Sequence, residues 1–293
     1  MRRRALVLVN RGARRGAERL DSALEVLRDG IDLVDRRDAE PRDLAQVIRG
    51  ERKRVDLVIL GGGDGTLSAA LPALLELGKP LGVLPLGTAN NLARTLDIPT
   101  DLDEAARIIV QGHSRRIDVG QVNDRHFLTT ASLGLSVRIT QELTTASKRR
   151  WGPLAYGLAA LRTLRGGRDT IRAEVRYEGR VIRVRALQVV VGNGRYYGSG
   201  MAVAEDARID DGRLDLYMVE PQPRWRLVLL LPALKRGSQG EKPNVVAASS
   251  SAFEIRSSRQ WDIDVDGEIG ASTPATFSVL PGALEVLVPG GAE

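Results

Sequence analysis

Residues 55–67 of the sequence are VDLVILGGGDGTL, and this stretch decides the fold class. Its first six residues form a short apolar run typical of a buried strand, and residues 67–77 beyond it follow a helical pattern. The three consecutive glycines between them let the backbone turn tightly and approach a ligand without obstruction by a Cβ atom. The stretch therefore predicts a buried strand that ends in a tight turn and passes directly into a helix.

This turn is a candidate phosphate site. The start of the helix offers free amide groups and a positive dipole end, both of which favour phosphate. Asp64 would repel a phosphate in direct contact, but it fits if Mg²⁺ lies between the two groups. The turn matches neither G-x-x-x-x-G-K-[ST] nor G-x-G-x-x-G, because Gly63 is followed three residues later by Thr66. A purely structural turn is the alternative interpretation.

A second turn of the same kind lies in residues 84–94, LPLGTANNLAR, which again end a strand and open a helix. Parallel strands bring their carboxyl ends to one edge of a sheet, where ligands of such sheets bind. We therefore expect residues 63–66 and 87–91 to share one crevice. Thr88 is a candidate either to bond a phosphate oxygen or to cap the helix.

The rest of the chain divides into two patterns. Up to about residue 112, strands alternate with helices, which predicts a parallel sheet covered by helices. The expected strands are 5–9, 31–34, 55–60 and 81–84, and the expected helices are 17–28, 44–49, 67–77, 90–96 and 102–110. From about residue 115, closely spaced strands with turn signals predict an antiparallel sandwich or barrel. They are expected at 117–122, 126–132, 171–177, 181–191, 214–219, 253–256, 261–265, 275–279 and 284–288.

Two helical insertions, 137–164 and 224–235, are expected to interrupt the second pattern, and 237–243 is expected to be a loop. We predict an α/β N-terminal domain over residues 1–117 and a β-rich sandwich domain with helical insertions over residues 118–293. The last strand is a candidate to return toward the N-terminal domain.

The composition of the 293-residue chain excludes several kinds of functional site and partner. Cysteine is absent, which excludes a disulfide framework, a Cys-ligated metal and a Cys nucleophile. Only His113 and His126 are present, so a His-rich metal site or a Ser-His-Asp triad is hard to build. The net charge of +6 favours an anionic partner. Aromatic residues make up only 4%, so we expect a phosphate or lipid partner and no nucleic acid.

Apolar runs and basic clusters bear on localisation. Residues 5–9 are too few for the apolar core of a signal peptide, and residues 227–234 are too few for a membrane span. Residues 148–151, KRRW, and 223–226, PRWR, each place a tryptophan among basic residues, which suits an anionic membrane surface or ordinary packing. We expect a cytoplasmic protein that associates peripherally with an anionic membrane.

The paired turns carry a resemblance. GGDGT at 62–66 and PLGTANN at 85–91 resemble the diacylglycerol kinase catalytic-domain family, above all its soluble bacterial lipid kinases, and more distantly NAD kinases. Residues 117–120, 192–201, 210–215 and 266–268 follow in the family's order. The resemblance implies Mg²⁺- and ATP-dependent transfer of the γ-phosphoryl group to a lipid hydroxyl. It also implies a nucleotide-binding N-terminal domain, a lipid-binding C-terminal domain and a site between them.

Site residues follow from the same resemblance. Asp64 and Asp118 match carboxylates near the catalytic Mg²⁺, and Glu268 matches the general base, with Asp266 beside it. Nucleotide contacts would come from Asn10, Arg11, Gly12, Arg14, Gly62, Gly63, Gly65, Thr66, Gly87, Thr88 and Asn91.

Two acidic segments of the second domain have alternative interpretations. On an extended segment Asp266 and Glu268 would face the same side, whereas a solvated acidic turn is the plainer alternative. Residues 208–213 resemble a structural magnesium loop, with a carboxylate from Asp211 and backbone carbonyls from Arg208 and Arg213. An Asp-Asp-Gly hairpin turn is compatible with that interpretation.

The chain departs from the family pattern at two positions. Arg11 stands where the family usually has proline, and Asn91 stands where many members have aspartate, which lowers the carboxylate count around the metal by one. Two alternatives therefore stay open: a kinase of a soluble substrate such as NAD, and a nucleotide- or lipid-binding protein without catalysis. The acceptor (diacylglycerol, sphingoid base, phosphatidylglycerol or polyprenol), the preferred nucleotide and the oligomeric state, a homodimer included, are also left open.

Overall fold

The computed structural model of the protein describes residues 2–10, 17–51, 53–135, 137, 170–198 and 200–290, with the backbone alone at 17–19, 35–37 and 224. The chain forms two compact units. The first unit comprises Met1–Val119 and Pro281–Glu293, and the second comprises Gly120–Leu280. Of the helical insertion expected at 137–164, residues 138–164 lie outside the described residues.

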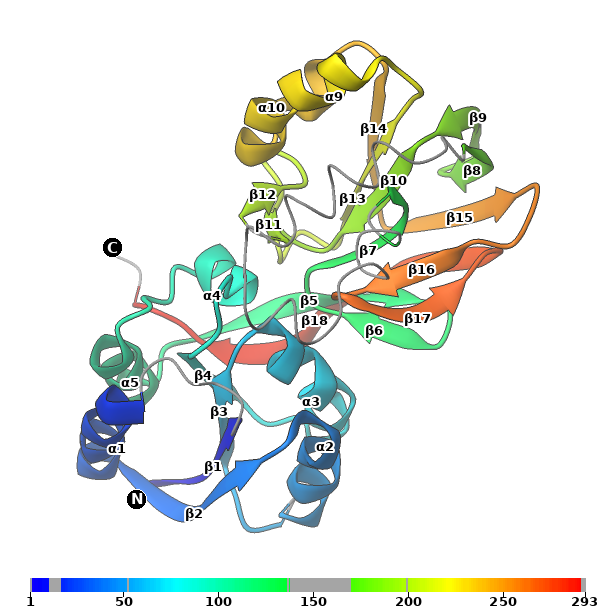
Figure 1. The fold of residues 1–293 in the computed structure, drawn as a ribbon. Coiled ribbons are helices and arrows are strands. Elements are labelled where there is room, and N and C mark those ends of the chain that lie inside the picture. The colour runs from blue at the N-terminus through cyan, green and yellow to red at the C-terminus, as the bar shows by residue number, and fades with distance from the viewer. Residues whose placement is uncertain are drawn as a thin grey trace. The chain divides into compact units, whose positions relative to one another are not determined.

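The first unit alternates strands and helices (Figure 1). Its elements are β1 (Arg3–Asn10), α1 (Ala17–Gly30), β2 (Ile31–Ala39), α2 (Pro41–Gly50), β3 (Leu57–Gly62), α3 (Asp64–Leu77), β4 (Leu81–Pro85), α4 (Asn91–Thr95), α5 (Leu102–Gln111) and β5 (Ser114–Val122).

The sheet of the first unit is parallel, as predicted. Its strand order is β2-β1-β3-β4, and the end of β18 (Ala275–Leu287) joins beside β4 in parallel through Val286 and Leu81. α1 packs with α5 on one face and α2 with α3 on the other (Figure 1). Every residue of β3 and β4 is buried, because helices cover both faces of the sheet.

The second unit is built mainly of antiparallel strands. It contains the first part of β18, up to Leu280. Its other elements are β6 (Arg125–Phe127), β7 (Thr130–Gly134), β8 (Ile171–Tyr177), β9 (Arg180–Ala186), β10 (Gln188–Gly192), β11 (Tyr196–Tyr197), β12 (Met201–Ala202), β13 (Leu214–Val219), α9 (Arg224–Leu229), α10 (Leu231–Arg236), a 3₁₀ turn (Ser238–Glu241), β14 (Val245–Ser250), β15 (Ala252–Ser257), β16 (Asp262–Val265) and β17 (Glu268–Ser272).

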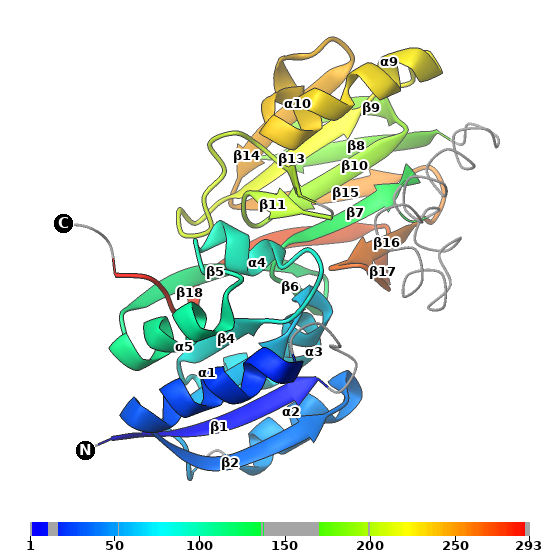
Figure 2. The ribbon, with the colours of Figure 1, turned by 60° about the vertical axis from the view of Figure 1, so that its left-hand side comes forward.

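These strands form a sandwich, as predicted. One sheet has the order β14-β13-β10-β7-β16-β17, and the strands β18-β15-β8-β9 form the layer that packs against it. The core between the layers contains three fully buried phenylalanines, Phe127, Phe253 and Phe277. α9 and α10 pack on the other face of the first of these sheets, beside β13 (Figure 2).

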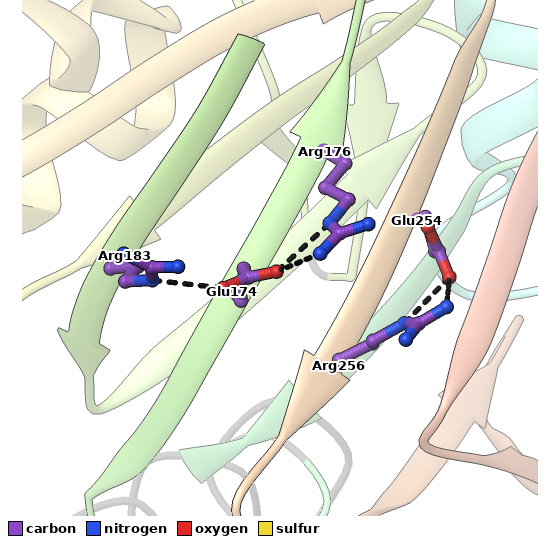
Figure 3. Close-up of polar contacts among 5 residues, drawn as sticks. All are labelled: Glu174, Arg176, Arg183, Glu254 and Arg256. Carbon is purple, nitrogen blue, oxygen red and sulfur yellow. Dashed lines mark hydrogen bonds and ion pairs between the residues drawn. The ribbon is translucent and has the colours of Figure 1, made fainter. Parts of the chain in front are cut away.

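Charged side chains line β8, β9 and β15 near the edge of the second layer (Figure 3). Glu174 pairs with Arg176 at 2.7 Å and with Arg183 of β9 at 2.8 Å, and Glu254 pairs with Arg256. The two arginines hold the pKa of the Glu174 carboxyl below its usual value. Exposed pairs of this kind stabilise little, but charges along an edge strand oppose pairing with another sheet.

Several expected strands have different bounds. The strand expected at 126–132 is two strands, because the amides of Leu128 and Thr129 bond a carboxylate between them. The strand expected at 181–191 is also two strands, because the chain crosses from one sheet to the other at Leu187. The strands expected at 275–279 and 284–288 are one strand, β18, with Gly282 in a left-handed conformation at φ 56°.

Other elements were missed or divided differently. β14 and β17 were not expected, and the helix expected at 224–235 is two short helices joined at Leu230. The expected loop at 237–243 contains a 3₁₀ turn. Among the described residues, no helix is both long enough and apolar enough to span a membrane.

Candidate active site

The two glycine turns meet at the carboxyl ends of β3 and β4. Gly62 and Pro85 are paired at the ends of these strands, and the Leu86 amide donates to the Gly62 carbonyl at 3.0 Å. A Cβ atom on Gly63 would lie 2.9 Å from the Cα of Gly87, and one on Gly87 would lie 2.5 Å from the Cα of Gly63. The backbones therefore touch at a distance that only glycine permits, and the structure brings together the two turns that the sequence places in one crevice.

Asn90 closes the second turn. Its side chain accepts a hydrogen bond from the Gly87 amide at 2.9 Å and donates one to the Gly87 carbonyl at 3.0 Å. It takes a left-handed conformation, φ 49°, and is the residue that precedes α4. Thr88 is exposed and does not cap the helix. Sequence reasoning missed Asn90, although asparagine three residues after a turn glycine is a signal, because its short side chain tolerates this conformation.

Asp64 lies in the first turn of α3, half-buried, where the helix dipole favours a carboxylate. Its Oδ2 accepts from Nδ2 of Asn91 at 3.2 Å, and its Oδ1 accepts from the Leu92 amide at 3.2 Å. The carboxylate of α3 is thus held by the start of α4. Asn91 donates a hydrogen bond where an aspartate would place a second negative charge beside Asp64.

Asn10 connects the end of β1 to the same turn. Its Nδ2 donates to Oγ1 of Thr66 at 2.8 Å. Thr66 is only 3% exposed and packs so closely on Gly62 that a Cβ atom there would collide with it. Gly65, by contrast, faces open space. The expected nucleotide contacts Arg11, Gly12 and Arg14 lie outside the described residues.

Asp118 belongs to the first unit, in β5, and is 2% exposed. Its Oδ1 accepts from the Gly282 amide at 2.8 Å, so the carboxylate holds the left-handed bend of β18.

Asp266 holds a turn of the second unit together. Its carboxylate accepts from the amides of Leu128, Thr129 and Thr130 at 2.8, 2.9 and 3.2 Å, and from the Thr129 hydroxyl at 2.6 Å. These four bonds fix the segment between β6 and β7. Thr129 is a further supporting residue that the sequence did not reveal.

The expectation that Asp266 and Glu268 share one face of an extended segment is wrong. Asp266 and Gly267 have φ values of 50° and 94° and form the turn between β16 and β17, so the acidic-turn alternative describes the backbone. Glu268 opens β17 and is exposed. Its carboxylate makes no hydrogen bond or ion pair with the described residues.

Residues 208–213 form an Asp-Asp-Gly turn. Oδ1 of Asp211 accepts from the Arg213 amide at 3.0 Å, Gly212 has φ 70°, and the Arg208 side chain pairs with Asp210 at 3.3 Å. Burial raises the pKa of the carboxyl of Asp215 just beyond the turn, and the nearby Asp211 and Asp206 carboxylates raise it further. Within the described ranges, no three acidic or His side chains converge into a metal-binding group.

A cavity of about 870 Å³ lies elsewhere, at the opposite ends of the strands of the first unit. Arg2, Arg3, Arg4 and Arg28 line it together with Asp32 and Asp56. Arg4 pairs with Asp56 at 3.3 Å, and Arg3 bonds the carbonyls of Ile109 and Val110 at the end of α5. These contacts tie down the amino ends of the sheet, and the cavity does not belong to the glycine turns.

Comparison with known proteins adds evidence of descent. The family model of the diacylglycerol kinase catalytic domain matches residues 4–122, and that of the YegS C-terminal NAD kinase beta sandwich-like domain matches residues 129–288. Together they cover both units.

Individual relatives agree with these matches. A diacylglycerol kinase of Staphylococcus carnosus is 30% identical over 243 residues, 82% of this chain and 79% of the relative. One of Staphylococcus aureus is 31% identical over 245 residues, 82% of this chain and 77% of the relative. A crystal structure of a proposed diacylglycerol kinase from Bacillus anthracis superposes with a TM-score of 0.80 at 26% identity, over 98% of this chain and 97% of that one.

Proposed function

This chain belongs to the diacylglycerol kinase catalytic-domain family, and from that premise we propose that it transfers the γ-phosphoryl group of ATP, with Mg²⁺, to the hydroxyl group of a lipid. Its relatives make it a lipid kinase, and diacylglycerol is the acceptor that their names carry. The nucleotide, the metal ion and the roles of single residues are our proposal.

The observation that carries the proposal is the contact between Gly63 and Gly87. Two strand-to-helix turns in contact present backbone amides, with no Cβ between them, at one edge of a parallel sheet. Such an edge is where α/β sheets bind phosphates. We assign the triphosphate to this edge, with the exposed Thr88 as a hydroxyl donor to it.

The chemistry of Asp64 fits Mg²⁺. The ion is usually bound through one or two carboxylates plus substrate phosphates instead of a closed protein cage. Asp64 offers one half-buried carboxylate beside the proposed phosphate site, and the described residues contain no group of three acidic side chains that could hold a metal ion. This arrangement matches the usual coordination of Mg²⁺. When bound, the ion would offset the negative charge that develops on the transferred phosphoryl group. Asn91 and Leu92 would hold the carboxylate in position.

Glu268 is the proposed general base. It would take the proton of the lipid hydroxyl as that oxygen bonds to the γ-phosphorus and the bond from phosphorus to the bridging oxygen breaks, releasing ADP. Its carboxylate has no partner among the described residues, so no bond has to break before it accepts a proton. Asp266 positions the turn that carries Glu268, because its own carboxylate is engaged by four donors.

For Asp118 and the Asp211 loop we propose supporting roles. Asp118 would act through β18, whose bend its carboxylate holds, and its direct part near the metal stays a prediction. A structural magnesium ion at Asp211, with the carbonyls of Arg208 and Arg213, also stays a prediction. Burial and, after it, the Asp211 and Asp206 carboxylates raise the pKa of the Asp215 carboxyl, and a cation beside them would favour its ionised form.

A transfer assay with γ-labelled ATP tests the function. The purified protein is incubated with Mg²⁺ and a panel of diacylglycerol, sphingoid base, phosphatidylglycerol and polyprenol, with NAD in a parallel reaction. We expect label in the organic phase, dependent on Mg²⁺. Label on NAD would instead make the protein a soluble-substrate kinase, and no label above background in any reaction would make it a binding protein without catalysis.

A further inference from the structure

We propose that α9 and α10 dock the protein on an anionic lipid bilayer through an outer patch formed by Trp225, Val228, Leu229 and Leu231. The proposal rests on the proposed function to the extent that a lipid acceptor supplies the reason for docking. The observations that carry it concern the second unit alone.

The outer patch gathers large hydrophobic side chains that are exposed to solvent. Among the described residues, six large hydrophobic side chains are exposed, and four of them lie within seven consecutive residues. Trp225 is 59% exposed, Val228 55%, Leu229 67% and Leu231 51%. Exposed apolar side chains gathered within one short segment mark a surface that another apolar phase covers, because each loses favourable burial in water.

Other residues attach the two helices to the protein. Leu230 and Ala233 are each 6% exposed and pack, with the partly buried Leu227 and Leu234, on a cluster that includes Tyr217 of β13. The two helices together therefore have an apolar inner face that packs on the second unit. The outer patch is a second apolar surface of the same helices, and it is not needed to hold them in place.

Charge identifies the covering phase. Between Glu220 and Glu241 the sequence contains four cationic residues and no acidic residue. Arg226, within the patch segment, and Lys235 and Arg236, a turn beyond it in α10, are exposed. The Arg226 guanidinium lies 5.2 Å from the centre of the Trp225 ring. Exposed tryptophan and leucine flanked by arginine and lysine suit the boundary between head groups and acyl chains of an anionic bilayer.

The same charge argues against a second copy of the chain as the cover. In a two-fold dimer the patch would meet itself, and each set of cations would face an identical set with no carboxylate between Glu220 and Glu241 to pair with. An anionic bilayer supplies the opposite charge and the apolar phase together.

Flotation with vesicles, without nucleotide, tests the docking. We expect the wild-type protein to float with vesicles of phosphatidylglycerol and phosphatidylcholine and to float much less with phosphatidylcholine alone. The double variant Trp225→Ala/Leu229→Gln should bind the anionic vesicles about tenfold more weakly or worse, because two side chains no longer enter the bilayer. Each of Arg226→Gln and Lys235→Gln should weaken binding roughly fivefold, and less at high salt.

Val181→Ser is the matched control, because Val181 of β9 is 52% exposed but lies outside the patch. It should float like the wild type. Quenching of tryptophan fluorescence by brominated lipid should fall in Trp225→Phe, which keeps the fold and removes the reporter. Thermal unfolding of every variant should match the wild type, since the altered side chains are exposed.

Three outcomes overturn the proposal. The wild type fails to float with anionic vesicles, or the double variant floats as well as the wild type. Alternatively, light scattering shows a wild-type dimer that the double variant converts to monomer while vesicle binding is unchanged, which makes the patch a subunit interface. Flotation requires no turnover, so its result stands whether or not any lipid is phosphorylated. If the kinase reaction occurs, the double variant should keep its rate on short-chain diacylglycerol in solution and lose rate only on vesicles.

Discussion

Asp64 and Asp266 are both aspartates of glycine-containing turns, but their carboxylates are held for different purposes. The Asp266 carboxylate accepts four hydrogen bonds from the backbone and hydroxyl of a neighbouring segment. The Asp64 carboxylate, half-buried at the start of a helix, is oriented by Asn91 and by one amide. Saturation by backbone donors is typical of a structural carboxylate, whereas partial exposure is typical of a functional one, as we propose for Asp64.

Asp64→Asn should lower the kinase rate by about a hundredfold or more, because it removes the negative charge proposed to hold the metal ion. It should cost stability only about 1 kcal/mol, from the lost helix-dipole and hydrogen-bond contributions. Steady-state kinetics and thermal unfolding measure the two effects. Asp56→Asn is the control, since this carboxylate stands at the opposite end of β3 and pairs with Arg4. A wild-type rate in Asp64→Asn would show that the site is assigned wrongly.

Glu268→Gln should lower the catalytic rate, whereas Asp266→Asn should lower the stability of the fold. Glu268→Gln should reduce kcat with little change in ATP affinity or stability, because a base acts in the transition state and this side chain is exposed. Asp266→Asn should lower the free energy of unfolding by about 3 kcal/mol, because an amide nitrogen cannot accept from the Leu128–Thr130 segment. Denaturant titration and kinetics separate the cases. Weaker ATP binding at unchanged kcat in Glu268→Gln would make this residue a nucleotide contact.

At the scale of elements, the site depends on how two strand-to-helix turns pack. β3 and β4 are neighbours in the sheet, and their register aligns Gly62 with Pro85. This alignment sets the Cα atoms of Gly63 and Gly87 in contact. Asn90 then gives the second turn its shape through two bonds to Gly87. Close contact between two backbones therefore leaves no room for a Cβ atom at either glycine.

Gly63→Ala and Gly65→Ala should change stability in opposite directions. A Cβ at Gly63 would lie 2.9 Å from the Gly87 backbone, which cannot yield as a flexible side chain would, so we expect a loss of about 1–3 kcal/mol. A Cβ at Gly65 meets no atom within 4 Å, and alanine favours the helix, so we expect a gain of up to about 1 kcal/mol. Chemical denaturation of both variants measures this. An undiminished stability in Gly63→Ala would show that the turns do not touch in solution.

At the scale of the whole molecule, each unit has its own buried core, and β5 and β18 run through both. The pKa of each titratable group is therefore set by the packing of the unit to which it belongs. His126 of β6 belongs to the second unit, and burial lowers the pKa of its imidazole below the usual value of 6.5. The folded protein therefore binds a proton there less readily than the unfolded chain does.

The sign of the pH dependence follows. Above about pH 6.5 neither state protonates His126, and its contribution to stability is fully present. As the pH falls below 6.5, the unfolded chain takes up a proton that the folded protein resists, so the free energy of unfolding decreases. Denaturant titrations between about pH 5.5 and 7.5 should show this slope, and His126→Gln should reduce it. Equal slopes in both proteins would mean that His126 is solvated in the folded state.

The sequence by itself determined the architecture and the two turns. Apolar runs and helical patterns act over a few residues, so residues 55–67 predicted β3, the turn and α3 without reference to the rest of the chain. The glycine turns carried the family resemblance, which the matches over residues 4–122 and 129–288 confirm. The same local logic was wrong at Pro281 and Gly282, where it predicted a break in what is one strand.

Only the tertiary structure decided what each polar side chain does. Asp266, Asp118 and Asn90 act through backbone groups that they meet by folding, and the first two meet partners more than a hundred residues away. No local pattern encodes such a meeting, because it depends on the register of strands and on left-handed residues at turns. The outer patch of α9 and α10 is the same case, since its apolar residues resemble core residues in the sequence and only packing shows which of them face water.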